Sequence, residues 1–119
     1  MPNTPFQIVH NNLIYCSGNI GLDPSTNALV TSSIGARTIQ AIKNLSAILE
    51  AGGSSLEKII KVNIYLTTMA NFAAMNEAYK SVMPTPFPAR TCVAVKELPM
   101  GTDVEIECVA YVNPITAKL

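Results

Sequence analysis

The feature that most constrains the fold is a run of period-two hydrophobicity across residues 88–110. Apolar and polar side chains alternate on both sides of a turn at residues 98–101, which is the spacing of β-strands. The pattern predicts a β-hairpin. In that hairpin Arg90 and Cys92 share one face of the first strand, because alternate side chains point the same way. Glu105 lies on the facing strand, since the turn is about midway between it and Arg90.

Arg90 is one of two arginines in the chain, and its strand is otherwise apolar. A guanidinium that leaves water needs an anion, because burying it unpaired is costly. Two interpretations stay open on the residues alone. In the first, Glu105 or Glu107 supplies the anion through a cross-strand pair. In the second, Arg90 binds a substrate carboxylate, with Glu105 beside it as an acid or a base.

Hydrophobic periodicity and turn residues predict the other elements. Asn11-Asn12 separates two short apolar runs, which is typical of a hairpin turn. From about residue 33 the period changes to that of a helix, which Gly52-Gly53 ends. The predicted elements are strands at 6–10, 13–20 and 60–67, a brief edge strand at 29–30, helices at 33–51 and 71–83, and a short helical turn from the capping-box spacing of Ser54 and Glu57.

This order predicts an α+β fold, a two-layer sandwich in which two helices cover one face of a mixed β-sheet. A chain of 119 residues is expected to form one domain, covering residues 1–119. Strand 60–67 is expected to point Ile60 and Val62 to the same side. Arg37, off the apolar stripe of its helix, is expected on the helix surface. Gly18 lies within a strand, which indicates a bulge or the close approach of a backbone or ligand.

The charge pattern argues for self-association and against nucleic acid. Lys plus Arg and Asp plus Glu both number 8, so the net charge is zero, whereas nucleic-acid binding needs a concentrated basic face. Charged residues are 13% of the chain, against roughly 25% in ordinary soluble domains. The strands are also apolar on nearly both faces. We therefore expect a homo-oligomer in which the helix-free face of the sheet packs against another subunit.

Several functional classes lack support in the residues. No apolar run approaches the roughly 18 residues of a membrane span, and the N-terminus does not resemble a secretory signal. No Walker loop, dinucleotide glycine pattern or nucleophile elbow is present. His10 is expected at a solvated strand end rather than as a catalytic base. The cysteines, Cys16, Cys92 and Cys108, have no metal-ligand spacing and are expected as reduced thiols in an intracellular protein.

Six segments of the chain match a known pattern: 12–20, 23–24, 60–66, 71–79, 88–93 and 104–110. Together they resemble the RidA/YjgF family of reactive-intermediate deaminases, also called the L-PSP or perchloric-acid-soluble protein family. The resemblance covers about residues 11–112. Its most specific part is Pro-Ala-Arg-x-Cys-Val at 88–93, followed by Glu-Ile-Glu at 105–107, which matches the subfamily that retains the catalytic arginine.

The resemblance implies a chorismate-mutase-like fold assembled as a homotrimer, with three clefts between subunits. It implies hydrolysis of 2-imino acids, such as 2-iminobutanoate and 2-iminopropanoate, to 2-keto acids and ammonia without metal or cofactor. By position, Arg90 would hold the substrate carboxylate, Glu105 would orient or activate water, and Cys92 would act through its backbone. A fork-shaped donor suits a carboxylate, and a positioned water suits an electrophilic imine carbon.

The same resemblance implies the lining of the cleft. Ser17 and Gly18 would line it, and Asn76 matches a family position near the site. The family's usual N-terminal tyrosine is missing, and Phe6 is the candidate for its aromatic place. Rival functions in this family are a single-strand endoribonuclease that inhibits translation, and a chaperone-like or ligand-binding protein without turnover. The expected compartment is the cytoplasm, with the mitochondrion as the alternative.

Overall fold

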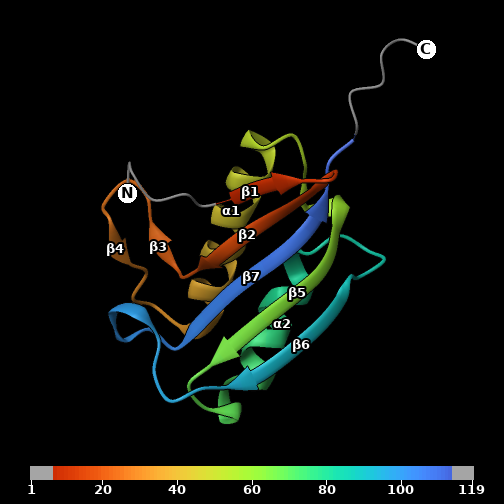
Figure 1. The fold of residues 1–119 in the computed structure, drawn as a ribbon. Coiled ribbons are helices and arrows are strands. Elements are labelled where there is room, and N and C mark those ends of the chain that lie inside the picture. The colour runs from red at the N-terminus through yellow and green to blue at the C-terminus, as the bar shows by residue number, and fades with distance from the viewer. Residues whose placement is uncertain (1–6, 114–119) are drawn as a thin grey trace, which may run out of the picture.

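A computed structural model describes residues 7–113 of the chain and has two layers, a five-stranded sheet and two helices on one of its faces (Figure 1). The sheet order is β1-β2-β7-β5-β6, and a second sheet pairs β3 with β4. The strands are β1 (Gln7–His10), β2 (Leu13–Asn19), β3 (Leu22–Asp23), β4 (Ala28–Leu29), β5 (Ile59–Leu66), β6 (Ala89–Ala94) and β7 (Val104–Tyr111), and the α-helices are α1 (Ile34–Ala51) and α2 (Phe72–Val82). Short 3₁₀ turns lie at Leu56–Lys58, Met69–Asn71 and Pro99–Gly101. The predicted two-layer α+β architecture is confirmed.

The hairpin predicted for residues 88–110 is wrong, although both of its strands exist. β6 pairs in parallel with β5, and β7 pairs antiparallel with both β5 and β2, so β5 lies between the two strands. The reason is the crossover through α2, which makes β5 and β6 parallel neighbours. The connection to β7 then passes the end of β5, where the Val95 amide donates to the Leu66 carbonyl at 2.7 Å. β6 is consequently an edge strand.

The elements begin and end for identifiable reasons. Asn11 and Asn12 both have positive φ, 53° and 63°, as a two-residue hairpin turn between β1 and β2 requires. The Ser33 side chain caps α1 by accepting from the Ala36 amide at 3.0 Å. Ser54 does not form the predicted capping box, since its hydroxyl donates instead to the Tyr111 carbonyl at 2.7 Å.

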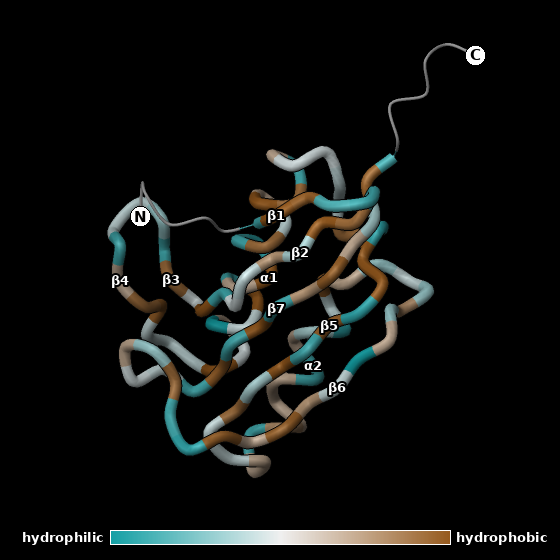
Figure 2. Tube along the Cα trace, viewed as in Figure 1, coloured by the Kyte–Doolittle hydropathy of each residue, from teal (hydrophilic) through white to brown (hydrophobic). Residues whose placement is uncertain are grey.

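The core lies between the helices and the sheet, and hydrophobic positions alternate along the strands (Figure 2). A register shift between Ile59 and Lys61 on β5 changes the predicted face at one end of that strand. Ile59 is buried there, whereas Ile60 is 46% exposed. The prediction for Ile60 was therefore wrong, because the bulge inserts one residue into the period-two pattern. Val62 is buried as predicted.

Arg37 is not a free residue of the helix surface. Its Nε and Nη2 donate to the two carboxylate oxygens of Asp103 at 2.8 and 2.9 Å, and its Nη1 donates to the Val30 carbonyl at 3.1 Å. This bidentate pair joins α1 to the start of β7. The Arg37 guanidinium holds the pKa of Asp103 below its usual range.

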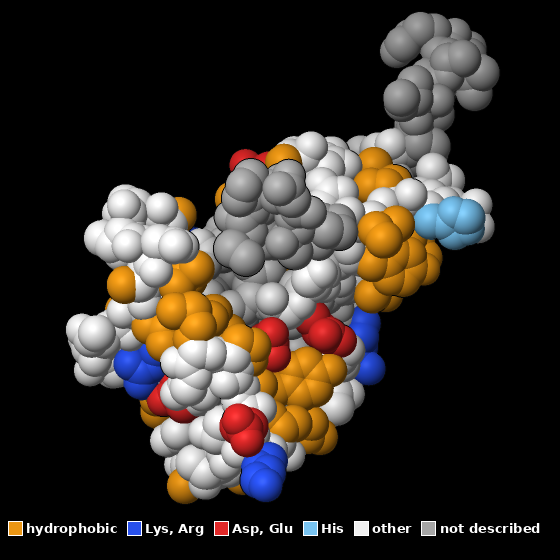
Figure 3. Space-filling model, turned by 60° about the vertical axis from the view of Figure 1, so that its left-hand side comes forward, with side chains coloured by type: hydrophobic (Ala, Val, Ile, Leu, Met, Phe, Trp, Pro, Cys, Tyr) orange, Lys and Arg blue, Asp and Glu red, His pale blue; other side chains and the backbone are white. Residues whose placement is uncertain are grey.

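The face of the sheet opposite the helices is open in the single chain. Large hydrophobic side chains are exposed on it, among them Ile8, Tyr15 and Val93. Figure 3 shows hydrophobic side chains with acidic groups among them over the side of the molecule that it presents. Within residues 7–113, no helix combines the length and the hydropathy that crossing a membrane requires. Association through the open face remains a prediction.

Candidate active site

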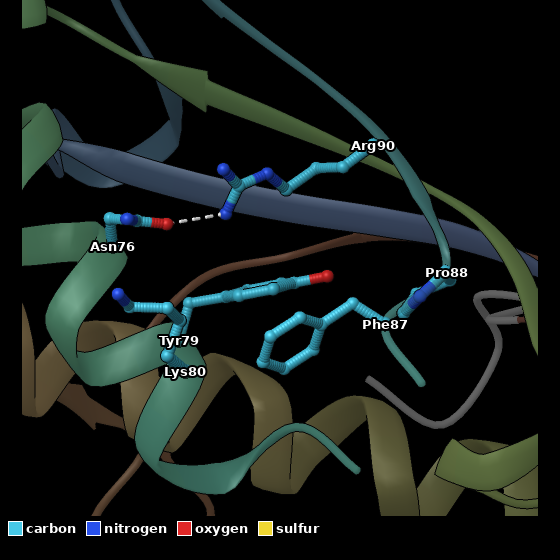
Figure 4. A pocket seen from close by; sticks show the side chains of 6 residues that line it. All are labelled: Asn76, Tyr79, Lys80, Phe87, Pro88 and Arg90. Carbon is cyan, nitrogen blue, oxygen red and sulfur yellow. Dashed lines mark hydrogen bonds between the residues drawn. The ribbon is translucent and has the colours of Figure 1, made fainter. Parts of the chain in front are cut away.

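Arg90 projects from the edge strand β6 toward α2, on the helix side of the sheet. Its Nη1 donates to the Asn76 Oδ1 at 2.7 Å (Figure 4). The guanidinium carbon lies 4.8 Å from the ring centroid of Tyr79 and 5.6 Å from that of Phe72. Both distances are within the range of cation–π attraction. One amide and two aromatic rings therefore hold the guanidinium in place.

A pocket of about 350 Å³ opens beside this guanidinium. Its walls come from α2 and from the chain that enters β6, and the residues that line it are Asn76, Tyr79, Lys80, Phe87, Pro88 and Arg90. The rings of Tyr79 and Phe87 lie 6.1 Å apart between centroids. Burial raises the pKa of the Tyr79 hydroxyl. The pocket thus combines donors and apolar walls, with no carboxylate among its lining residues.

Cys92 lies two residues further along β6, on the same face as Arg90. Burial raises the pKa of its thiol, although the charge of Arg90 acts in the opposite direction. A thiol with a raised pKa is a poor nucleophile near neutral pH. Its environment is therefore compatible with the expected role through the main chain.

Glu105 and Gly18 form a second group on the open face. A Cβ atom at Gly18 would overlap the carboxylate of Glu105, so the absence of a side chain makes room for that carboxylate. The pairing of β2 with β7 shifts register between Cys16 and Asn19, which confirms the bulge expected at Gly18. Ser17 is exposed beside it.

Burial and the nearby charge of Glu107 raise the pKa of Glu105. Glu107 itself accepts hydrogen bonds from Asn63 Nδ2 and from the Tyr65 hydroxyl, each at 3.1 Å. Among the described residues, no side chain donates a hydrogen bond to the Glu105 carboxylate. Glu105 is therefore a carboxylate with a raised pKa and, among the described residues, without a side-chain hydrogen bond.

Arg90 and Glu105 lie on opposite faces of the sheet. On β5, Arg90 is in register with Val62 and Glu105 with Tyr65. Residues in register on neighbouring strands point to the same side of a sheet. Val62 and Tyr65 are three positions apart on β5, so they point to opposite sides. The cross-strand pair considered for Arg90 is therefore wrong within one chain, for Glu105 and equally for Glu107, which shares its face. Within residues 7–113 the one salt bridge is that of Arg37 with Asp103.

The structure thus brings the predicted residues together in two groups: Arg90, Asn76 and Cys92 on one face, and Glu105, Gly18 and Ser17 on the other. Phe6 lies outside the described residues. Sequence reasoning missed the roles of Tyr79, Phe72 and Lys80 around Arg90. Their spacing with Asn76 on α2 was the available signal, because residues three and four apart share a helix face.

A sequence-family model described as Endoribonuclease L-PSP matches residues 4–112. Together with its relatives, this match shows that the chain belongs to the RidA/YjgF family.

Two relatives illustrate the range of names in this family. The chain is 47% identical over 103 residues to the mitochondrial protein mmf1 of Schizosaccharomyces pombe, a match that covers 84% of this chain and 62% of that protein. It is 40% identical over 103 residues to the human 2-iminobutanoate/2-iminopropanoate deaminase, covering 87% of this chain and 75% of that one. The chain therefore spans less than two thirds of the fission-yeast protein's length.

Solved structures confirm the fold. RidA from an Antarctic Psychrobacter superimposes with a TM-score of 0.87 at 37% identity, covering 92% of this chain and 89% of that chain. Escherichia coli TdcF, solved with bound serine, gives a TM-score of 0.84 at 29% identity and covers 89% of this chain and 85% of that chain. The two-layer α+β architecture is thus the RidA/YjgF fold.

Proposed function

We propose that this protein hydrolyses 2-imino acids, such as 2-iminobutanoate and 2-iminopropanoate, to 2-keto acids and ammonia. The observation that carries the proposal is the environment of the Arg90 guanidinium. Asn76 and two aromatic rings hold it beside a pocket whose lining residues include no carboxylate. Such an arginine has donors left for the carboxylate of a substrate. The names of the human and Dermatophagoides farinae relatives support this reaction class.

In the proposed reaction, Arg90 binds the substrate carboxylate and the main chain at Cys92 assists it. A water molecule attacks the imine carbon, one proton passes to the imine nitrogen, and the C–N bond of the resulting carbinolamine breaks. The carbonyl forms as ammonia leaves, so atoms balance with water as the co-reactant. Glu105 takes the proton from the attacking water, a task for which a carboxylate of raised pKa is suited.

The reaction needs both groups of residues at one substrate, and we propose that assembly brings them together. In a homotrimer, the Arg90 pocket at the sheet edge of one subunit would meet the Glu105, Gly18 and Ser17 group of the next. Three observations support this arrangement: β6 is an edge strand, the open face is hydrophobic, and Glu105 lies on that face. Closed rings of this kind use heterologous contacts.

The serine bound in the TdcF structure is a small molecule with a carboxylate and an α-nitrogen. The proposed 2-imino acid substrate has the same two groups.

For the compartment, we propose the cytoplasm, with the mitochondrion as the alternative that the name of the fission-yeast relative supports. The cofactor-free hydrolysis proposed here needs only water in addition to the imine.

The test is hydrolysis of 2-iminobutanoate that an amino-acid oxidase generates in the assay. We expect the protein to accelerate release of ammonia and 2-ketobutanoate above the spontaneous rate, and light scattering to give the mass of a trimer. Hydrolysis at the spontaneous rate would refute the proposal. A parallel incubation with labelled single-stranded RNA tests the ribonuclease alternative, for which cleavage without imine hydrolysis would be the supporting result.

A further inference from the structure

The pocket beside Arg90 contains a second cation that the reaction proposed above does not use. Lys80 lines it together with Arg90, and the lining residues include no Asp or Glu. Among the described residues, neither cation lies in a salt bridge. Two uncompensated positive charges therefore share one concave site, which favours a ligand with two negative charges.

Lys80 lies on the same helix as Asn76, the residue that anchors Arg90. The guanidinium contacts Asn76, and Lys80 follows Asn76 by four residues on α2, on the same helix face. Four residues are slightly more than one helical turn, a rise of about 6 Å along the helix axis. Figure 4 shows the Arg90 guanidinium and the Lys80 side chain at the Asn76 end of the pocket. A dicarboxylate has its anionic groups at its two ends, so one can meet the guanidinium while the other extends toward Lys80.

The size of the pocket agrees with a ligand longer than a four-carbon acid. Its volume is about 350 Å³, and pockets of roughly 300–1,000 Å³ hold molecules of drug size. The rings of Tyr79 and Phe87 supply an apolar wall for methylene groups between the two charged ends. Charge and volume thus favour the same class of ligand.

We propose that this pocket binds 2-imino acids that carry a second carboxylate, the imines of acidic amino acids, with Lys80 binding the distal carboxylate. This proposal rests on the proposed function for the identity of the reacting group. Lys80 acts as a specificity residue that contacts substrate away from the reacting carbon. Since it is exposed, its effect is screened by salt and is several-fold rather than orders of magnitude.

The test compares the affinities of 2-oxoglutarate and 2-oxobutanoate, the keto-acid products, by calorimetry on the full chain. Lys80→Gln is expected to weaken 2-oxoglutarate binding by about three- to tenfold at low salt, and to change 2-oxobutanoate binding less than about twofold. The matched control is Lys43→Gln, which removes an exposed lysine from α1 and should change neither affinity. Thermal unfolding of each variant monitors the fold.

Equal loss of both affinities in Lys80→Gln, or no loss of either, would overturn the proposal. So would the same selective loss in Lys43→Gln, because that result assigns the effect to overall charge. The outcome for the proposed function is separate. If 2-iminobutanoate is hydrolysed but Lys80→Gln is not selective, the dicarboxylate inference alone is wrong. If no imine is hydrolysed yet the selective loss is seen, the dicarboxylate site stands and the deaminase proposal falls.

Discussion

Replacing Arg90 by alanine separates a structural role of this residue from a role in substrate binding. In the folded chain the change removes the 2.7 Å hydrogen bond to Asn76 and the contacts with the Phe72 and Tyr79 rings. Because Arg90 is half-exposed, each contact contributes about 0.5–1 kcal/mol. No carboxylate in the described chain loses a partner. We therefore expect the free energy of unfolding to fall by about 1.5–3 kcal/mol, which leaves the protein folded.

The effect on catalysis should be larger than the effect on stability. A charge-assisted hydrogen bond to the substrate carboxylate is worth about 1.5–3 kcal/mol, or roughly 10- to 150-fold in kcat/KM, and misplacement of the imine carbon adds to this. Arg90→Lys keeps the charge but loses the two-pronged donor, so it should restore little activity. Asn76→Ala keeps the guanidinium and removes its anchor, and is expected to lie between the parent and Arg90→Ala.

The assay is release of ammonia and 2-ketobutanoate, with thermal unfolding and light scattering on the same samples. The informative result is a folded, assembled Arg90→Ala protein with most activity lost. A folded Arg90→Ala protein that hydrolyses 2-iminobutanoate at the parent rate would refute the assignment of Arg90. A protein that unfolds on this change, while Arg90→Lys is folded and fully active, would favour a structural role for the positive charge.

Three further predictions concern other parts of the chain. Gly18→Ala should displace the Glu105 carboxylate and lower turnover at least about tenfold. The loss of stability should be small, because the flexible Glu105 side chain can move. An unchanged rate of turnover would contradict this prediction. The lowered pKa of Asp103 means that its ion pair with Arg37 contributes stability above the unfolded-state pKa and loses it as pH falls through the folded pKa. Asp103→Asn should accordingly lower the free energy of unfolding at pH 7 by about 1 kcal/mol and flatten its acid dependence, as urea titrations at several pH values would measure. Cys92→Ala should keep most activity. Alkylation of the parent protein should be slow at neutral pH, because burial raises the pKa of the Cys92 thiol. Rapid inactivation by the alkylating reagent, prevented by a 2-keto acid, would count against a main-chain role.

Sequence periodicity predicted the elements well because each depends on local rules. The helix predicted at 33–51 is found at Ile34–Ala51, with Ser33 as its N-cap, and the turn at Asn11-Asn12 has the positive φ angles that asparagine tolerates. Strand partners depend on more than local rules. Residues 88–110 read as a hairpin because nothing in two alternating runs shows that a third strand lies between them.

The candidate site was predictable residue by residue but not in its arrangement. Phe72 and Tyr79 were visible as apolar positions on one face of a helix, yet their contact with Arg90 depends on α2 packing beside the edge strand β6. Period two also places Arg90 and Glu105 on definite faces, but only the register with Val62 and Tyr65 on β5 shows that those faces are opposite.

That opposition has a consequence for the reaction itself. If Arg90 binds the substrate carboxylate and Glu105 activates the water, one folded chain cannot supply both groups to one substrate, because the sheet separates them. Assembly is then a chemical requirement of the proposed reaction as well as a means of covering the exposed side chains of Ile8 and Tyr15. The low charge content and the split site, which are independent observations, thus favour the same arrangement of subunits. A monomeric form with full activity would be incompatible with the roles assigned to this pair.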